Sequence, residues 1–169
     1  MMGKRMRIAV LGTGTVGRTL ASGLHGLGNE VVIGTREPAA TLAREGTDGF
    51  GTWAAAHPAV AVATFAEAAA GAGLVVNALS GEASATGIEA AALAPGTVLL
   101  DVSNPLDSAS GFPPPLFVSN TDSLAEQLQR AHPDLRVVKS LHTMTAHLMT
   151  GPRALAGGAF STFVCGNDA

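Results

Sequence analysis

Disulfide bonds, a basic surface and long apolar runs are all missing from this 169-residue sequence, and each absence excludes a class of protein. Cys165 is the only cysteine, so no disulfide can form within the chain and a reducing compartment is expected. Charged residues make up only 14% of the chain, and the formal net charge is −3. A chain with this charge has no basic footprint for nucleic acid or for an anionic membrane.

No apolar run approaches the length that a transmembrane helix needs. The run that follows the basic start, Ile8 to Leu11, stops at a glycine and is too short for the core of a signal peptide. We therefore expect a cytoplasmic protein that binds neither nucleic acid nor membrane. Its length and its 47% of hydrophobic residues fit one globular domain, residues 1–169, that can bury a real core.

Residue groupings typical of metal sites or of nucleophilic catalysis are missing as well. His25, His57, His132 and His147 have no carboxylates at ligand spacing, so no metal site is expected. The serine-rich stretches contain no nucleophile elbow. Cys165 falls in a strand expected to be buried, where a thiol behaves as a small hydrophobe. These absences favour a protein whose chemistry is carried by a bound cofactor.

What the sequence does contain is an alternation of short β-rich runs with alanine-rich helical stretches. Strands are expected at residues 7–11, 30–35, 60–63, 74–79, 97–102, 137–141 and 161–165. Helices are expected at residues 14–27, 65–68, 83–93 and 123–131, with another that begins at Pro38. The alternation predicts an α/β fold: a Rossmann-type, doubly wound, mainly parallel sheet with helices on both faces.

Two stretches interrupt this alternation. Residues 45–58 are rich in glycine and are predicted to form an irregular connection. Residues 104–120 hold four prolines and are predicted to form a surface excursion without regular structure.

The motif G-x-G-x-x-G lies between the first strand and the first helix, with glycines at Gly12, Gly14 and Gly17. In a dinucleotide site the first glycine makes a tight turn, the second lets the backbone approach the pyrophosphate, and the third lets helix and strand pack closely. The pyrophosphate then lies over free N–H groups at the positive end of the helix dipole. The alternative is that the glycines serve only as turn residues.

The end of the second strand distinguishes the two nicotinamide cofactors. An NAD site places a carboxylate there to accept from the ribose 2′-hydroxyl, whereas this chain has Thr35 and Arg36. A hydroxyl can donate to a 2′-phosphate, and a guanidinium can pair with it, which favours NADP(H). Arg44 is a further candidate, and Glu37 is expected to point away from the ribose. The alternative is a solvated arginine on a loop.

Three further loops follow the carboxyl ends of strands, where ligands bind in open α/β sheets. Leu79 and Ser80 follow the fourth strand, and their backbone is a candidate wall for the nicotinamide ribose. Asn104 and Pro105 follow the fifth strand, and the Asn104 amide can address the ribose or the carboxamide. A plain Asn-Pro turn is the alternative there, and Asp101 is equally compatible with a buried carboxylate that caps a helix.

His142 follows the sixth strand, on the same edge of the sheet as the glycine turn. A second substrate would meet the nicotinamide there, and an imidazole can donate to a substrate carbonyl or orient it. A lone histidine can equally be structural.

Five segments in this order resemble the coenzyme F420-dependent NADP oxidoreductase family: Ile8–Gly17, Val31–Arg36, Asp101–Leu106, Val137–Thr143 and Phe163–Asn167. The resemblance implies a direct hydride exchange between C5 of a deazaflavin and C4 of the nicotinamide. It also implies a homodimer.

The resemblance assigns roles to individual positions. Thr13, Thr15 and Val16 correspond to the pyrophosphate loop, and Thr35 with Arg36 to the 2′-phosphate pair. The remaining correspondences are Leu79 and Ser80 to the nicotinamide wall and His142 to the deazaflavin side.

Members of the family continue past the strand that contains Phe163–Asn167, with elements that help to enclose the deazaflavin, while this sequence ends at Ala169. We therefore expect NADP(H) binding to be retained better than F420 binding or turnover. The leading hypothesis is an NADP(H)-dependent oxidoreductase with F420 as its small-molecule redox substrate. Alternatives are a reductase of a flavin, quinone or metal ion, and a non-catalytic NADP(H)-binding or sensing module.

Overall fold

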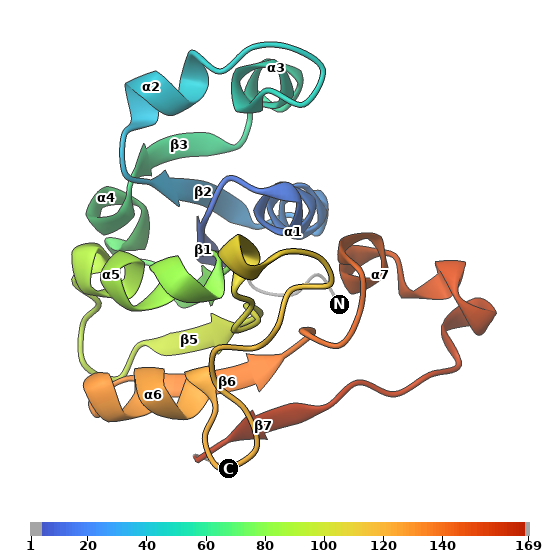
Figure 1. The fold of residues 1–169 in the computed structure, drawn as a ribbon. Coiled ribbons are helices and arrows are strands. Elements are labelled where there is room, and N and C mark those ends of the chain that lie inside the picture. Colours follow the sequence, from blue (N-terminus) through green and yellow to red (C-terminus); the bar gives the residue numbers. More distant parts are fainter. Residues whose placement is uncertain (1–4, 168–169) are drawn as a thin grey trace.

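In the computed structural model, which describes residues 5–167, seven strands form one sheet in the order β3-β2-β1-β4-β5-β6-β7 (Figure 1). The first six strands are parallel, and β7 is antiparallel to β6. This arrangement confirms the Rossmann-type, doubly wound fold. The strands are β1 (Arg7–Leu11), β2 (Glu30–Thr35), β3 (Ala61–Thr64), β4 (Leu74–Asn77), β5 (Val98–Asp101), β6 (Arg136–Ser140) and β7 (Val164–Gly166).

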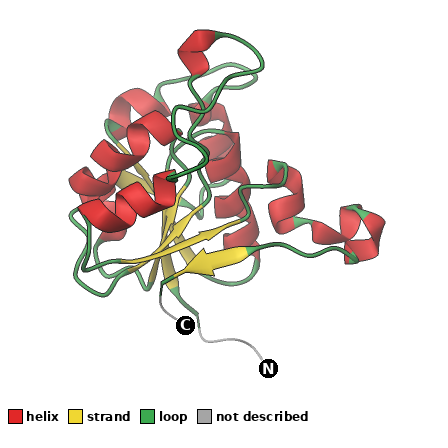
Figure 2. Ribbon diagram, turned by 60° about the horizontal axis from the view of Figure 1, so that its bottom comes forward, coloured by secondary structure: helices red, strands yellow, loops and turns green. Residues whose placement is uncertain are grey.

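Helices cover both faces of the sheet (Figure 2). They are α1 (Thr15–Gly26), α2 (Pro38–Leu42), α3 (Phe50–Ala56), α4 (Phe65–Ala69), α5 (Gly81–Ala91), α6 (Leu124–Ala131) and α7 (Ala146–Thr150). Short 3₁₀ turns occur at Ser108–Ser110, Pro152–Ala154 and Ala156–Gly158. Within residues 5–167, no helix is both long enough and apolar enough to cross a bilayer.

Alternating side chains of the central strands build a core on each face. Along β1, Ile8 and Val10 pack with residues of α1 and α3, while Ala9 and Leu11 pack with residues of α4, α5 and α6. These four side chains are at most 3% exposed. This burial on both faces explains why the strand is a continuous apolar run.

Most predicted boundaries lie within two residues of the observed ones, but the connection predicted at residues 45–58 is wrong, because it contains α3. Phe50 is buried, and its ring lies 5.3 Å from that of Trp53, so apolar burial stabilises this helix. A Cβ on Gly51 would lie 2.0 Å from the carbonyl oxygen of Leu42. The glycine therefore permits a close contact with α2 rather than interrupting the helix.

The last strand also differs from the prediction. It begins at Val164 instead of residue 161, and its three residues are exposed. Cys165, predicted to be buried, is exposed because β7 is the last strand of the sheet order. Helix α7, which was not predicted, packs on α1, where a Cβ on Gly23 would lie 2.4 Å from a carbon of Thr150. The segment between α7 and β7 extends away from the body of the molecule (Figure 1).

Candidate functional site

The turn between β1 and α1 is held by backbone contacts that leave no room for side chains. Gly12 has φ of +120°, and a Cβ there would lie 2.5 Å from the carbonyl oxygen of Ala78. A Cβ on Gly17 would lie 2.2 Å from the carbonyl oxygen of Gly12. Gly14, by contrast, has open space around the position of a Cβ. Two glycines therefore serve packing, and the third leaves the front of the turn accessible.

The accessible front of the turn coincides with the N-terminus of α1. Gly14 is the N-cap residue and supplies no side-chain hydrogen bond, so the first N–H groups of this twelve-residue helix remain available to an anion. Thr13, Thr15 and Val16, assigned to the pyrophosphate loop by resemblance, surround Gly14 in this turn and in the first turn of the helix. The turn thus fits a pyrophosphate.

A cavity of about 420 Å³ lies beside the glycine turn, at the ends of β1 and β2. Thr35 ends β2, and its hydroxyl lies 3.0 Å from that of Thr41 in α2, both residues being buried. If Thr41 donates, the Thr35 hydrogen is free for a phosphate. The lining consists of Gly12, Thr13, Gly34, Thr35, Arg36, Glu37, Thr41, Arg44, Phe65 and Leu79.

Two arginines and one glutamate face this cavity. Arg36 follows β2, and Arg44 donates to the Thr13 hydroxyl at 2.9 Å, with its guanidinium 5.9 Å from the ring centre of Phe50. Glu37, expected to point away from the ribose, also belongs to the lining because it is the N-cap residue of α2. The cavity therefore carries two cations against one anion, which suits a phosphate.

The other predicted site residues lie together at the carboxyl ends of β4, β5 and β6. The Asn104 amide donates to the backbone carbonyl of His142 at 3.0 Å. A Cβ on Gly81, next to Ser80, would lie 2.4 Å from the carbonyl oxygen of Asn104. Leu79 follows β4 but lines the smaller cavity together with Thr35 and Arg36. It therefore connects the residues around that cavity with those at the ends of β4, β5 and β6.

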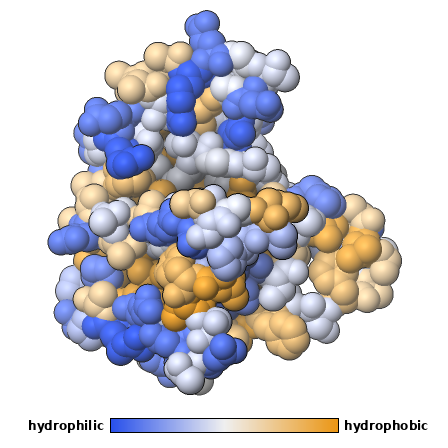
Figure 3. Space-filling view, in the orientation of Figure 1, coloured by the Kyte–Doolittle hydropathy of each residue, from blue (hydrophilic) through white to orange (hydrophobic). Residues whose placement is uncertain are grey.

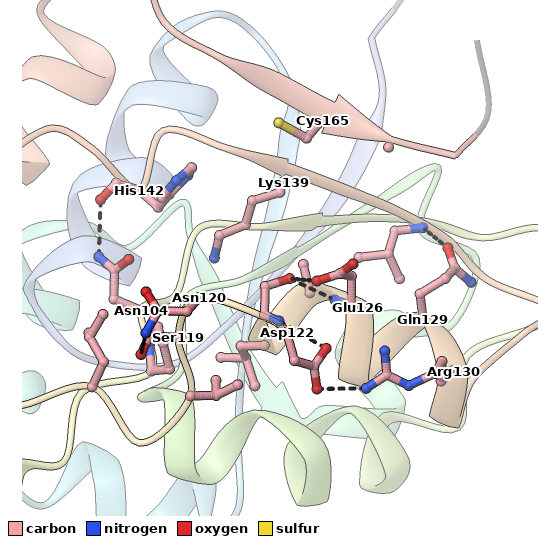
Figure 4. Close-up of a pocket in the computed structure, with 18 of the residues that line it drawn as sticks. Asn104, Ser119, Asn120, Asp122, Glu126, Gln129, Arg130, Lys139, His142 and Cys165 are labelled. Atoms are coloured by element: carbon pink, nitrogen blue, oxygen red, sulfur yellow. Dashed lines mark hydrogen bonds and ion pairs between the residues drawn. The ribbon is translucent and has the colours of Figure 1, made fainter.

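Asn104, Pro105 and His142 line a second, larger cavity of about 910 Å³. Figure 4 shows Asn104 and His142 at one end, Lys139 and Cys165 above, and Asp122, Glu126 and Arg130 at the other end. Leu116 and Val118 of the excursion supply apolar lining. Figure 3 shows apolar surface gathered in this part of the molecule. The cavity combines apolar walls with polar ends, as sites for organic ligands do.

His142 lines the larger cavity and follows a residue with an unusual backbone conformation. Leu141, which precedes it, has φ of +62°, a left-handed conformation that leucine rarely adopts and that is found disproportionately at functional sites. The Nδ1 atom of His142 is buried and has no hydrogen-bond partner in the described part of the chain. Burial lowers the pKa of His142 below its ordinary 6.5, and the positive charge of Lys139 lowers it further. The imidazole is therefore neutral at pH 7.

Sequence reasoning missed the residues that support this corner. Asp101 is fully buried, but it caps no helix: it pairs with Lys139 and accepts a hydrogen bond from Asn77. Polar residues inside otherwise apolar strands were the available signal. Within residues 5–167, no group of three or more histidine, cysteine or acidic residues is placed to hold a metal ion.

Fold and site together indicate a protein that binds a dinucleotide. Residues 7–105 match the family described as NADP oxidoreductase, coenzyme F420-dependent. The chain belongs to this family, and it therefore uses NADP(H) as its nicotinamide cofactor.

Similar proteins agree with this assignment. A candidate F420-dependent NADP-reductase from Arthrobacter sp. FB24 is 55% identical, with a TM-score of 0.93 over 97% of this chain and 75% of its own. Metalloreductase STEAP3 of Rattus norvegicus is 30% identical over 96% of this chain, which spans only 29% of that relative. A 3-hydroxyisobutyrate dehydrogenase of Mycobacterium tuberculosis, 24% identical with a TM-score of 0.57 over 81% of this chain and 40% of its own, shares the fold.

The different surroundings of Gly12 and Gly14 predict that alanine lowers stability at Gly12 and mainly weakens cofactor binding at Gly14. Gly12→Ala should lower the free energy of unfolding by about 2 kcal/mol, because it adds backbone strain and a clash with Ala78. Thermal unfolding should then show a Tm lower by roughly 4–8 °C.

Gly14→Ala is the matched control, because its side chain meets nothing in the protein. It should cost less than about 1 kcal/mol of stability, yet weaken NADPH binding by roughly tenfold or more, measured by titration calorimetry, because it blocks the backbone approach to the pyrophosphate. Full NADPH affinity in G14A would contradict a pyrophosphate at this turn.

The position of His142 predicts that its imidazole titrates below pH 6.5. NMR of ¹⁵N-histidine-labelled protein, with the signal assigned by its loss in His142→Asn, should show this midpoint. Because the unfolded chain then binds the proton more tightly, stability is lost as the pH falls through about 6.5. A midpoint at or above 6.5 would show that the ring is hydrated rather than buried.

Proposed function

We propose that this protein transfers a hydride directly between NADP(H) and coenzyme F420. The observation that carries the proposal is that both cavities are lined by loops at the carboxyl edge of neighbouring strands: Leu79, after β4, lines the smaller one, and Asn104 and His142, after β5 and β6, line the larger. A dinucleotide held by Arg36 at its 2′-phosphate and by the glycine turn at its pyrophosphate would have its nicotinamide near these loops. The larger cavity then leaves room beside it for a second organic ring system.

Membership of the family supports the choice of F420, and so does the similarity to the Arthrobacter protein. The bound nicotinamide and deazaflavin would supply the redox chemistry, a hydride transfer between C4 of one and C5 of the other, with one proton from solvent completing the reduction of the deazaflavin. The protein supplies placement, orientation and exclusion of water, because the cofactor carries the difficult chemistry.

His142 is proposed to act on the second substrate. A neutral imidazole has one N–H donor and one acceptor nitrogen, so it can donate to a carbonyl oxygen of the acceptor ring. The Asn104 bond to its backbone carbonyl fixes the turn from which the ring projects. Its Nδ1 atom is buried, so the bond to the substrate would be made by Nε2.

Thr35, Arg36 and Arg44 are proposed to bind the 2′-phosphate. Arg36 is exposed at the end of β2, and Arg44 reaches the same cavity from the end of α2, where its contact with Thr13 links it to the glycine turn. Two guanidinium groups can engage a dianionic phosphate through several charge-assisted hydrogen bonds.

A reductase that uses another acceptor is the second candidate. The similarity to a protein named metalloreductase favours it, because that relative aligns over 96% of this chain. A metal chelate or a flavin would occupy the larger cavity in place of the deazaflavin. A non-catalytic NADP(H)-binding module would bind the cofactor and transfer its hydride to none of these acceptors.

The cofactor preference is tested by Arg36→Ala. Loss of the charged hydrogen bonds should weaken NADPH binding by about 1.5–3 kcal/mol, a factor of roughly 10 to 150 in Kd, and leave NADH binding nearly unchanged. Arg153→Ala, on the segment after α7, is a charge-matched control that should alter neither Kd. Equal losses of NADPH and NADH affinity in R36A would contradict a 2′-phosphate contact.

The hydride acceptor is tested by mixing the protein with NADPH and F420 and following the deazaflavin absorbance, with FMN, a quinone and ferric citrate in parallel assays. Reduction of F420 is expected, and His142→Ala should slow it by roughly 10²-fold without changing the Kd of NADPH. Tight NADPH binding with reduction of FMN, quinone or iron alone would replace the F420 assignment, and no reduction at all would indicate a binding module.

A further inference from the structure

A row of polar side chains crosses one face of the sheet at the carboxyl ends of three neighbouring strands. Asn77 on β4 is paired with Asp101 on β5, which is paired with Lys139 on β6. Laterally paired residues of adjacent strands project to the same face, so the three side chains lie next to one another. Two positions earlier in β4 and β5, Val75 and Leu99 belong to the apolar core of that face. The polar row therefore interrupts an otherwise hydrophobic layer.

Asp101 lies at the centre of the row and is fully buried. One carboxylate oxygen accepts from the Asn77 amide at 2.9 Å and from the Ser103 hydroxyl at 2.6 Å. The other lies 2.8 Å from the ammonium of Lys139, whose side chain is 15% exposed. Within residues 5–167, Lys139 is the only ion-pair partner of this carboxylate. A buried charge without a partner is strongly unfavourable, so the ion pair with Lys139 offsets the cost of burying the Asp101 carboxylate.

Lys139 also fixes the chain where it leaves β5. The same ammonium donates to the backbone carbonyl of Ser103, while the Ser103 N–H donates back to the carboxylate of Asp101 at 3.1 Å. The next residue is Asn104, whose amide holds the carbonyl of His142. The strained turn that carries His142 is thus held through Asn104 by a loop that Lys139 keeps in place.

The network extends to the loop after β4 as well. The Asn77 amide donates to the Ser84 hydroxyl at 2.9 Å, and that hydroxyl donates to the carbonyl of Ser80 at 2.9 Å. Asn77 and Ser84 are fully buried. The three loops after β4, β5 and β6 are therefore linked through one buried carboxylate and the lysine that neutralises it.

We propose that Lys139 is a positioning residue for the nicotinamide end of the site. By neutralising Asp101 and holding the Ser103 carbonyl, it fixes the relative placement of the loops that carry Ser80, Asn104 and His142. The inference rests on the proposed function in one respect, the placement of the nicotinamide at this corner. Replacing a buried ion pair by apolar residues often leaves stability unchanged or raises it, so fixed geometry explains this pair better than stability does.

Lys139→Met tests the proposal, because methionine retains the length of the side chain and removes the charge. Adenosine 2′,5′-bisphosphate, which carries the adenine and 2′-phosphate but no nicotinamide, should bind K139M with a Kd within about twofold of the original. NADPH should bind roughly tenfold more weakly and lose the fluorescence enhancement of its bound nicotinamide. A purely structural role would move both ligands together.

Two further variants separate positioning from misfolding. Lys139→Arg keeps the charge, and the adjoining cavity leaves room for the larger head group, so it should restore the nicotinamide fluorescence. The double variant D101N/K139M removes both charges, and it should recover the Tm that K139M loses without recovering the nicotinamide fluorescence.

Unchanged nicotinamide fluorescence in K139M, or equal loss of affinity for NADPH and the bisphosphate, would overturn the proposal. So would full recovery of the fluorescence in D101N/K139M, because the loops would then need no lysine. These readouts involve no hydride acceptor. Failure of F420 reduction would therefore contradict the proposed function, whereas the binding and fluorescence of K139M would still test the positioning role of Lys139.

Discussion

The backbone of Gly12 lies so close to the carbonyl of Ala78 that no side chain fits between them, and the site depends on this contact. It presses the β1–α1 turn against the loop after β4. The N-terminus of α1, which favours phosphate, is thereby fixed beside the loop that carries Leu79 and Ser80. In the proposed site, this contact would bring the pyrophosphate and the nicotinamide end of one cofactor to adjacent loops.

A second constraint is the lateral pairing of residues at the carboxyl ends of β4, β5 and β6. The parallel register places Asn77, Asp101 and Lys139 side by side on three strands, with Leu11 next in the same row. At Leu11 the row is apolar and belongs to the core, whereas from Asn77 onward it is polar and supports the loops above it. The apolar part of the row contributes to the stability of the core, and the polar part also holds the loops that follow the strands.

The sequence was sufficient to predict the fold and the positions of the residues that line the smaller cavity, because both depend on local signals. A buried strand followed by glycines at fixed spacing specifies the β1–α1 turn, and Thr35 and Arg36 follow directly from the end of the next strand. Their grouping around one cavity needed only the rule that parallel strands end at the same edge.

The features that were missed depend on contacts between distant residues. Helix α3 forms because Phe50 is buried and Gly51 allows close packing on α2, and the glycine alone suggested a break. The exposure of Cys165 follows from the place of β7 at the end of the sheet order, which its short apolar sequence does not reveal. The sequence places Lys139 in a strand, but it does not reveal that its partner is Asp101, 38 positions away in the chain.

The two ends of the site differ in the physics by which they recognise a ligand. Arg36 and Arg44 are exposed, so their attraction for a 2′-phosphate is screened by salt and reaches into solvent, which suits capture of a charged group. At the other end Asp101 is fully buried, and its charge is neutralised before any ligand arrives. The carboxylate instead accepts hydrogen bonds from the Asn77 amide and the Ser103 hydroxyl, and the next residue, Asn104, holds the backbone carbonyl of His142. Such preorganisation suits hydride transfer, in which distance and alignment between two rings matter more than long-range attraction.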